Sequence, residues 1–340
     1  MAGHSDTFHH VRDSIFFEVP GVLTSSHKYD SEHDAPWYVE NALHLHHPSL
    51  DELNEAMQGK ILVPQPFAGE SVDHPGFLLT KFMVLQFVAV VLVAWIGLGL
   101  ARRVSGGRPV SGRWWNFWEA MALYLRDNVV RPTIGTGHHG HDDHGHGHDD
   151  HGHHGHAPAA VEMGHPADKY LPFIWSCFFY VLICNLLGAL PWLGSPTGEI
   201  NVTGVLAVCA FGATVIYGSR ELGVVKFWTA LCPSMDVPAA MRPLLIPMIW
   251  AIELLGLFIK HGVLAVRLFA NIMAGHTVIA VFLGFIAAFA VTNPLFYVVT
   301  PASIAGQVGV GMLELFVAFL QAYIFAFLAT LFIGTAVHPH

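Results

Sequence analysis

Two very long apolar tracts constrain the fold of this chain most strongly. They run over residues 244–291 and 303–337, and each is longer than the about 20 residues that a helix needs to cross a bilayer. A helix over 247–285 would be roughly 58 Å long, against a hydrocarbon core of about 30 Å. Between residues 248 and 289 there is no proline and no polar turn cluster. We therefore predict two unbroken helices that lie steeply tilted in a membrane, since ordinary tilts average only about 20°.

The other apolar segments and the composition indicate a protein that crosses the membrane several times. Segments at 77–100, 170–192 and 202–217 are near the length of one crossing. The chain is 53% hydrophobic and 12% charged, with a mean hydropathy of +0.49, which is outside the range of typical soluble domains. We expect an all-α integral membrane protein with five membrane-crossing helices: one at 77–100, a hairpin over 170–220, and the long tilted pair over 244–337.

The distribution of lysine and arginine predicts the orientation. Loops at 193–200 and 292–302 contain neither residue, whereas the loops on the other side of the membrane are basic. Because Lys and Arg collect on the cytoplasmic side, five crossings place the N-terminus outside and the C-terminus in the cytoplasm. The basic residues that support this orientation are Arg102, Arg103, Arg108, Arg113, Arg126, Arg131, Lys169, Arg220, Lys226 and Arg242.

The first 76 residues are strongly acidic. They contain 12 acidic and three basic side chains, and they begin without the apolar core of a signal peptide. We expect residues 1–76 to form a translocated, polar external tail. The motif Ser-Leu-Asp-Glu at 49–52 is typical of a capping box and predicts one short helix in this tail.

A second helix is predicted at the cytoplasmic surface. Apolar side chains recur at intervals of three and four residues over 113–131, as expected of an amphipathic helix that lies in the interface. We expect Pro132 to end this helix and the apolar stripe to anchor it in the bilayer surface. The stripe consists of Trp114, Phe117, Trp118, Met121 and Leu125.

A histidine-rich tract follows this helix. Residues 137–156 comprise ten His, six Gly and four Asp, a composition that cannot bury a core and predicts a disordered cytoplasmic loop. Dense histidine binds transition metals weakly whether or not the cell uses it, so a solvated linker and a metal-buffering or pH-sensing segment are both open. Incidental metal ligands in the tract include His138, His139, His141, His144, His146 and His148.

Ionisable side chains lie inside the first long tract, where charge is costly. An arginine at the centre of a membrane helix costs roughly 2.5–3.5 kcal/mol on insertion scales, so Arg267 calls for a function. Glu253, Lys260 and Arg267 are seven residues apart and therefore share one stripe of the helix, which Asn271 extends. His276 lies half a turn away, on another face.

The second long tract carries a matching polar seam. Ser303 and Gln307 lead at helical spacing to Glu314 and Gln321, and the last three are seven residues apart. Two such seams predict a water-accessible or proton-conducting interface; the alternative is buried ion pairs that only hold the helices together, but these stabilise poorly for their cost. Small residues that permit close helix approach are Gly275, Gly284, Gly306, Gly309 and Gly311.

These motifs resemble subunit a of the membrane (Fo) sector of bacterial F-type ATP synthases. The segment RLFANIMAGH, at 267–276, carries the resemblance together with the upstream IPMIWAIELLGLFIKHGV and the downstream LELFVAFLQAYIFAFLATLFI. The motifs NLLGALP at 185–191 and NVT at 201–203 add to it, so that the similarity covers roughly residues 77–337. The acidic tail and the histidine tract fall outside the family pattern.

The resemblance implies a stator that supplies two proton half-channels to a rotating ring of c subunits. Arg267 matches the family's essential arginine, and Gln321 the glutamine across the helix pair from it. His276 and Glu314 match the polar pair of the outer half-channel, although several members have the acid first and the histidine second. Which of the two titrates stays open, and His276 favours H⁺ over Na⁺. The matching residues near the arginine and the cytoplasmic exit are Glu253 and Asn271.

The family also implies where the chain acts and with what. We expect a multi-pass protein of the bacterial inner membrane, surrounded by lipid and assembled with the c-subunit ring, the b-subunit peripheral stalk and the rest of the ATP synthase. The subunit needs no cofactor, no resident metal and no nucleic acid, and it is a component of the H⁺-transporting two-sector ATPase without chemistry of its own.

A divalent-metal transporter with a histidine-rich cytoplasmic loop is the alternative. It requires several His, Asp or Glu ligands that converge at mid-membrane. The long tracts offer His276, Glu253 and Glu314, and the nearby Arg267 would repel a cation.

Overall fold

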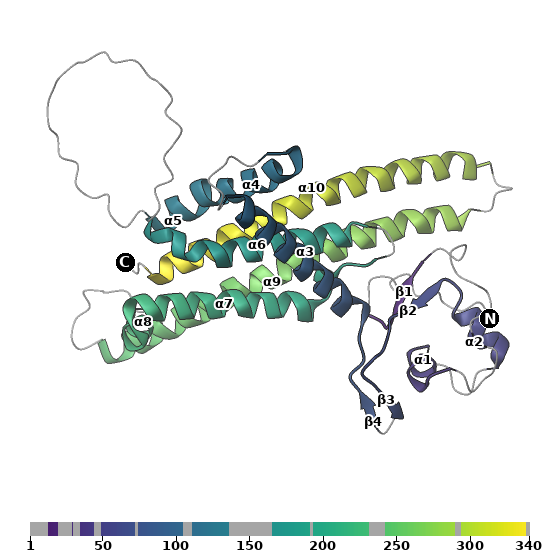
Figure 1. Ribbon diagram of the computed structural model, residues 1–340, viewed down its shortest axis with the longest axis horizontal. Helices are drawn as coiled ribbons and strands as arrows, with labels where there is room; N and C mark the ends of the chain where they lie inside the picture. Colours follow the sequence, from purple (N-terminus) through teal and green to yellow (C-terminus); the bar gives the residue numbers. More distant parts are fainter. Residues whose placement is uncertain are drawn as a thin grey trace, which may run out of the picture. The chain divides into compact units, whose positions relative to one another are not determined.

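The computed structural model is built mainly from long helices (Figure 1). It describes residues 13–19, 29, 35–43, 49–71, 74–104, 111–135, 165–190, 193–230, 242–289 and 294–337. The histidine tract lies outside these residues, so the hypotheses for it stay untested. Five helices in the described segments are long and apolar enough to cross a membrane, which confirms the predicted class. They are α3 (Lys81–Val104), α6 (Leu171–Gly188), α7 (Ile200–Leu222), α9 (Arg242–Ala288) and α10 (Phe296–Val337).

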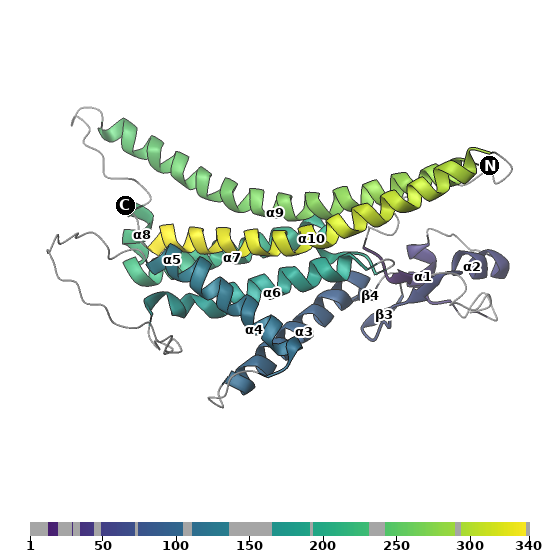
Figure 2. The same ribbon diagram turned by 90° about the horizontal axis from the view of Figure 1, so that it is seen from above.

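The prediction of two unbroken helices from the long tracts is confirmed. Helix α9 has 47 residues and α10 has 42, which correspond to lengths of about 70 and 63 Å. Each has one interior proline, Pro247 or Pro301, close to its first turn, where the lost hydrogen bond does not interrupt the rest of the helix; Pro243, the second residue of α9, loses no helical bond there. Figure 2 shows α9 as a single curved helix.

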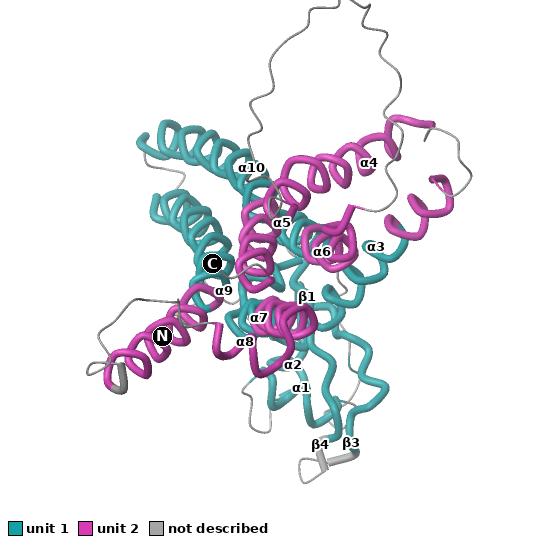
Figure 3. Tube along the Cα trace, turned by 90° about the vertical axis from the view of Figure 1, so that its left-hand side faces the viewer, with its two compact units in different colours: residues 1–95, 179–207, 262–322 teal, residues 96–178, 208–261, 323–340 magenta. Residues whose placement is uncertain are grey.

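The chain divides into two compact units, coloured separately in Figure 3. Unit 1 comprises residues 1–95, 179–207 and 262–322, and unit 2 comprises 96–178, 208–261 and 323–340. The division passes through all five long helices, because each contributes one part to each unit. Most of the predicted site residues belong to unit 1.

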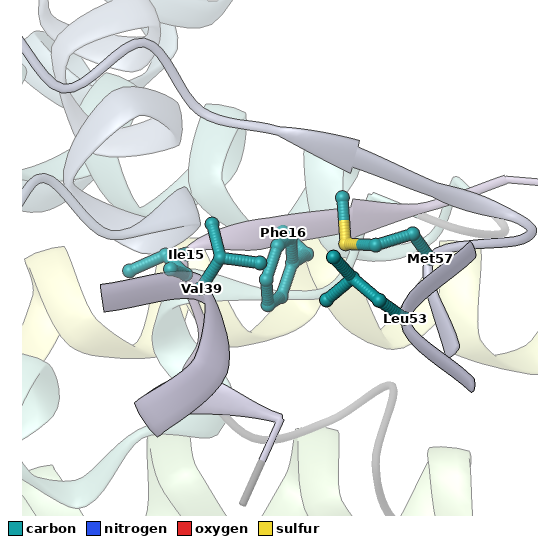
Figure 4. Close-up of a cluster of buried hydrophobic side chains, with 5 residues drawn as sticks. All are labelled: Ile15, Phe16, Val39, Leu53 and Met57. Carbon is teal, nitrogen blue, oxygen red and sulfur yellow. The ribbon is translucent and has the colours of Figure 1, made fainter. Parts of the chain in front are cut away.

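The N-terminal part of unit 1 contains more structure than the single helix expected of a polar tail. Strands β1 (Phe16–Glu18) and β2 (Lys60–Leu62) pair antiparallel, and β3 (Ala68–Ser71) pairs with β4 (His74–Gly76). Two short helices, α1 (Trp37–Ala42) and α2 (Leu50–Ala56), accompany them. Buried apolar side chains form a small core, shown in Figure 4: Ile15, Phe16, Val39, Leu53 and Met57.

The capping box predicted at the start of α2 is confirmed. The Ser49 hydroxyl accepts a hydrogen bond from the Glu52 amide at 3.5 Å, and the Glu52 carboxylate accepts one from the Ser49 amide at 3.1 Å. These bonds satisfy backbone donors that the first turn of a helix leaves unpaired.

The same part of the chain also caps the first long helix. The Lys81 amide donates to the Ser14 carbonyl at 2.8 Å, and the Phe82 amide donates to the Asp13 carboxylate at 3.2 Å. The Gln65 side chain bonds both backbone groups of Leu79, at 2.7 Å each. Residues far upstream in the sequence therefore fix the start of α3.

In unit 2, the predicted amphipathic segment forms α4 (Arg113–Leu125), a π-helical turn (Arg126–Val130) and α5 (Arg131–Gly135). The expectation that Pro132 ends the helix is wrong. A proline ring clashes with the carbonyl four residues earlier, and that carbonyl here belongs to the widened π turn, which accommodates the ring.

The apolar stripe of this segment is divided between two environments. Trp118 and Leu125 are buried, whereas Trp114 and Phe117 are exposed. The Trp175 indole of α6 donates to the Ala122 carbonyl of α4 at 3.0 Å, and Arg131 forms two hydrogen bonds to Asp168, at 3.0 and 2.9 Å. Part of the stripe thus packs within unit 2 and part stays exposed, and the anchoring of this helix in the bilayer surface stays a prediction. The short helix α8 (Val224–Ala230) completes the unit.

Candidate functional site

The site centres on Arg267 of α9. This side chain is half-buried, and its Nε and Nη2 atoms are buried without a hydrogen-bond partner in the described part of the chain. A guanidinium stays protonated at every working pH, so the group is a permanent positive charge inside a membrane-spanning helix. It is not held by a carboxylate among the residues that the structure describes.

Two close contacts fix how α9 and α10 pair within unit 1. A Cβ added to Gly275 would lie 2.8 Å from Oε1 of Glu314, and one added to Gly306 would lie 2.7 Å from the Phe282 ring. Each glycine therefore brings its own backbone against a side chain of the other helix. From the first contact to the second, the residue number rises from 275 to 282 on α9 and falls from 314 to 306 on α10. The two helices are therefore antiparallel here, and they lie side by side in Figure 2.

The same pairing places Gln321 opposite Arg267. Arg267 precedes Gly275 by eight residues on α9, and Gln321 follows Glu314 by seven residues on α10. The two glycine contacts are seven residues apart on α9 and eight residues apart on α10, so offsets of eight and seven residues put both side chains at nearly one level of the helix pair. The Nε2 atom of Gln321 is buried and has no hydrogen-bond partner in the described ranges.

Glu314 and His276 share a second level. The Glu314 carboxylate lies against Gly275, and His276 is the next residue of α9. Glu314 is 6% exposed, and its Oε1 atom makes no hydrogen bond within the segments that the structure covers. Seven or eight residues separate this level from that of Arg267, which corresponds to about 11 Å along the helix pair.

The remaining predicted residues are less closely associated. Asn271 is half-buried and lies one turn beyond Arg267 on α9. Glu253 and Lys260 are exposed, and both belong to unit 2. The structure thus places Arg267 level with Gln321 and His276 beside the contact of Gly275 with Glu314, whereas Glu253 belongs to the other unit.

Of the five glycines predicted to allow close helix approach, two do so. Gly275 and Gly306 each touch the partner helix, as described above. A Cβ added to any of the other three would meet nothing within 4 Å among the described atoms: Gly284, Gly309 and Gly311.

Sequence reasoning missed Thr300 and His261. Thr300 stands seven residues before Gln307, and one more step of the spacing would have included it. His261 is 3% exposed within unit 2; its Nδ1 lies 2.9 Å from the Leu257 carbonyl, and its Nε2 lies 3.4 Å from the Thr214 hydroxyl. We interpret His261 as a packed, hydrogen-bonded core residue rather than as a part of the site.

Ligands for a metal do not converge in the described ranges. Groups of three or more His, Cys, Asp or Glu side chains that could hold an ion are absent from them. The arrangement offers instead one fixed positive charge and, farther along the same helix pair, an acid and a histidine that can exchange protons. These groups suit the movement of protons rather than the transport of a divalent cation.

Comparison with known proteins agrees with this chemistry. The family described as ATP synthase A chain matches residues 158–334. A protein named ATP synthase subunit a from Myxococcus xanthus (strain DK1622) is 40% identical over 77% of this chain and 75% of its own length. Proteins of the same name from Chloroherpeton thalassium (strain ATCC 35110 / GB-78) and Anaeromyxobacter sp. (strain Fw109-5) are each 30% identical. They cover 85% and 100% of this chain and 77% and 73% of their own lengths. The chain therefore belongs to the subunit a family of bacterial F-type ATP synthases, the proton-translocating stator subunits of the membrane sector.

Proposed function

We propose that this ATP synthase subunit separates two aqueous half-channels with the charge of Arg267 and loads the ring of c subunits through Glu314 and His276. The observation that carries the proposal is the half-buried guanidinium of Arg267, which has no partner in the described chain and lies level with Gln321. A charge that is costly to bury and is not neutralised by the described residues of its own chain is available to a group on another subunit.

The partner we propose for Arg267 is a carboxylate of the c ring. A nearby guanidinium favours the ionised form of a carboxylate, so a ring carboxylate would release its proton as it passes Arg267. The guanidinium cannot itself relay a proton, because it does not lose one in proteins. It would therefore promote release of the proton from the ring carboxylate and prevent protons from passing directly between the half-channels.

The two levels of the site give the path a direction. With the N-terminus outside and the C-terminus in the cytoplasm, α10 runs inward from Phe296, and Glu314 comes before Gln321 along it. We propose that a proton enters through His276 and Glu314, rides the ring and leaves near Arg267, toward the cytoplasm, with Asn271 one turn from the arginine on α9. Glu253 is proposed to lie on the exit side. Each proton delivers about 2.3 kcal/mol per 100 mV of potential, so several are needed for one ATP.

A crosslinking experiment tests the proposed interface with the ring. Val263 is 57% exposed and lies on nearly the same face of α9 as Arg267, four residues before it. A cysteine at Val263 should form a disulfide with a cysteine placed beside the ring carboxylate in the assembled enzyme. The control is a cysteine at Leu264, which is 1% exposed and faces the interior of the chain. Crosslinking at neither position would contradict the proposal, as would crosslinking at Leu264 alone.

A further inference from the structure

Helix α10 carries a stripe of four polar side chains whose hydrogen bonding is incomplete. Each has a buried oxygen or nitrogen atom without a partner in the described chain, and each follows the previous one by seven residues. Seven residues advance a helix by about 10.5 Å and turn it by only about 20° from two full turns, so the four lie on one face. They are Thr300 (Oγ1), Gln307 (Nε2), Glu314 (Oε1) and Gln321 (Nε2).

The Thr300 hydroxyl differs from those of other threonines in the long helices because it lacks a hydrogen bond in the described chain. Thr214, Thr277 and Thr330 donate to the carbonyl four residues earlier in their own helices, at 2.9, 2.6 and 2.8 Å. Thr300 does not make this bond, and its hydroxyl oxygen is buried. Burying a polar group without a hydrogen bond costs free energy, most of all inside a membrane. We therefore expect the Thr300 hydroxyl to bond to water.

Gln307 belongs to the part of α10 that packs against α9. Its neighbour Gly306 rests on the Phe282 ring of α9, and the next polar residue of the stripe, Glu314, rests on Gly275. Val308 is 63% exposed and lies about 100° around α10 from Gln307, on a more exposed face of the helix. The stripe therefore does not lie on the most exposed face of α10, and bulk lipid does not explain its polar atoms.

We propose that Thr300 and Gln307 hold the chain of water molecules that leads protons from the outer end of α10 to Glu314. This inference rests on the proposed function and extends its entry path by two residues. A step of about 10.5 Å between side chains is bridged by about three waters at hydrogen-bond spacing. Thr300 and Gln307 are uncharged, so they would orient the waters without trapping a proton. They act as positioning residues, and Glu314 remains the residue that exchanges the proton.

Passive proton conduction through the membrane sector tests the proposal. The complete ATP synthase is assembled with Thr300→Val or Gln307→Leu, the catalytic sector is then stripped from the membrane vesicles, and proton flux is measured under an imposed potential. We expect each variant to lower the flux by about fivefold, the factor that corresponds to the loss of one typical hydrogen bond. Thr300→Ser and Gln307→Asn keep the polar group and should restore most of the flux. Val308→Ala is the matched control and should leave the flux unchanged.

The outcomes distinguish this inference from the proposed function. Normal flux in both Thr300→Val and Gln307→Leu overturns the inference, and the proposed function still stands if Arg267→Ala abolishes coupled pumping. Intact coupling in Arg267→Ala overturns the proposed function instead. Lower flux without rescue by the conservative variants would show that Thr300 and Gln307 are structural, and it would also overturn the inference.

Chemical accessibility provides a measurement that does not depend on flux. In a chain without its four native cysteines, a single cysteine at Thr300 or Gln307 should react faster with a water-soluble, membrane-impermeant thiol reagent than a cysteine at Val308. Reaction at equal or lower rates would mean that water does not reach the stripe, and would overturn the proposal.

Discussion

Replacing Arg267 with alanine should abolish coupled proton transport. The guanidinium has no partner in the described chain, so its whole charge is available to a carboxylate on the ring. Two opposite charges 4 Å apart interact by about 4 kcal/mol at an effective dielectric constant of about 20. One pKa unit corresponds to 1.36 kcal/mol, so losing this interaction would raise the pKa of the ring carboxylate by about three units. The carboxylate would then keep its proton at the point where it should release it.

ATP-driven acidification of inverted membrane vesicles measures this loss, with assembly checked by copurification of the ring. Arg267→Lys is the informative control, because it keeps a positive charge but replaces the planar, permanently protonated guanidinium with a group whose pKa falls when it is buried. We expect Arg267→Lys to fail as well. Proton-driven ATP synthesis at the normal rate in Arg267→Ala would refute the reasoning.

Three further predictions concern other parts of the chain. Glu314→Gln and His276→Ala should each slow passive proton flux without loss of assembly, and unchanged flux would remove that residue from the path. Gly275→Ala should also slow flux, because the added methyl group must displace the Glu314 carboxylate; Gly284→Ala, where the described structure leaves open space, should not. Ser49→Ala should weaken the start of α2 by about 1 kcal/mol. Hydrogen exchange of the α2 amides would then be about fivefold faster, with pumping unchanged, and unaltered exchange would show that the capping box contributes little.

The membrane helices could be predicted because their signals are local. Apolar length alone indicates that a tract spans the bilayer, and the absence of proline between residues 248 and 289 indicates that α9 continues without a break. A spacing of seven likewise places Gln307, Glu314 and Gln321 on one face without knowledge of any other helix. The capping box at Ser49 is a pattern of the same local kind.

Contacts between segments that are distant in the sequence could not be predicted in this way. Nothing in the sequence distinguishes Gly275 and Gly306, which touch the partner helix, from Gly284, which does not, because the difference depends on how two helices pair. In the N-terminal segment, Phe16 pairs with Leu62 through strands of only three residues, too short to show an alternating pattern.

The two glycine contacts have a mechanical consequence for a subunit that must resist a turning ring. Because glycine has no side chain, its backbone contacts the other helix directly, and closely packed contacts of this kind compress little. The contacts at Gly275 and Gly306 occur about 10.5 Å apart along the pair. These two contacts couple α9 to α10 at two points along their length. Torque applied beside Arg267 would therefore be resisted by both helices together, and neither would bend alone.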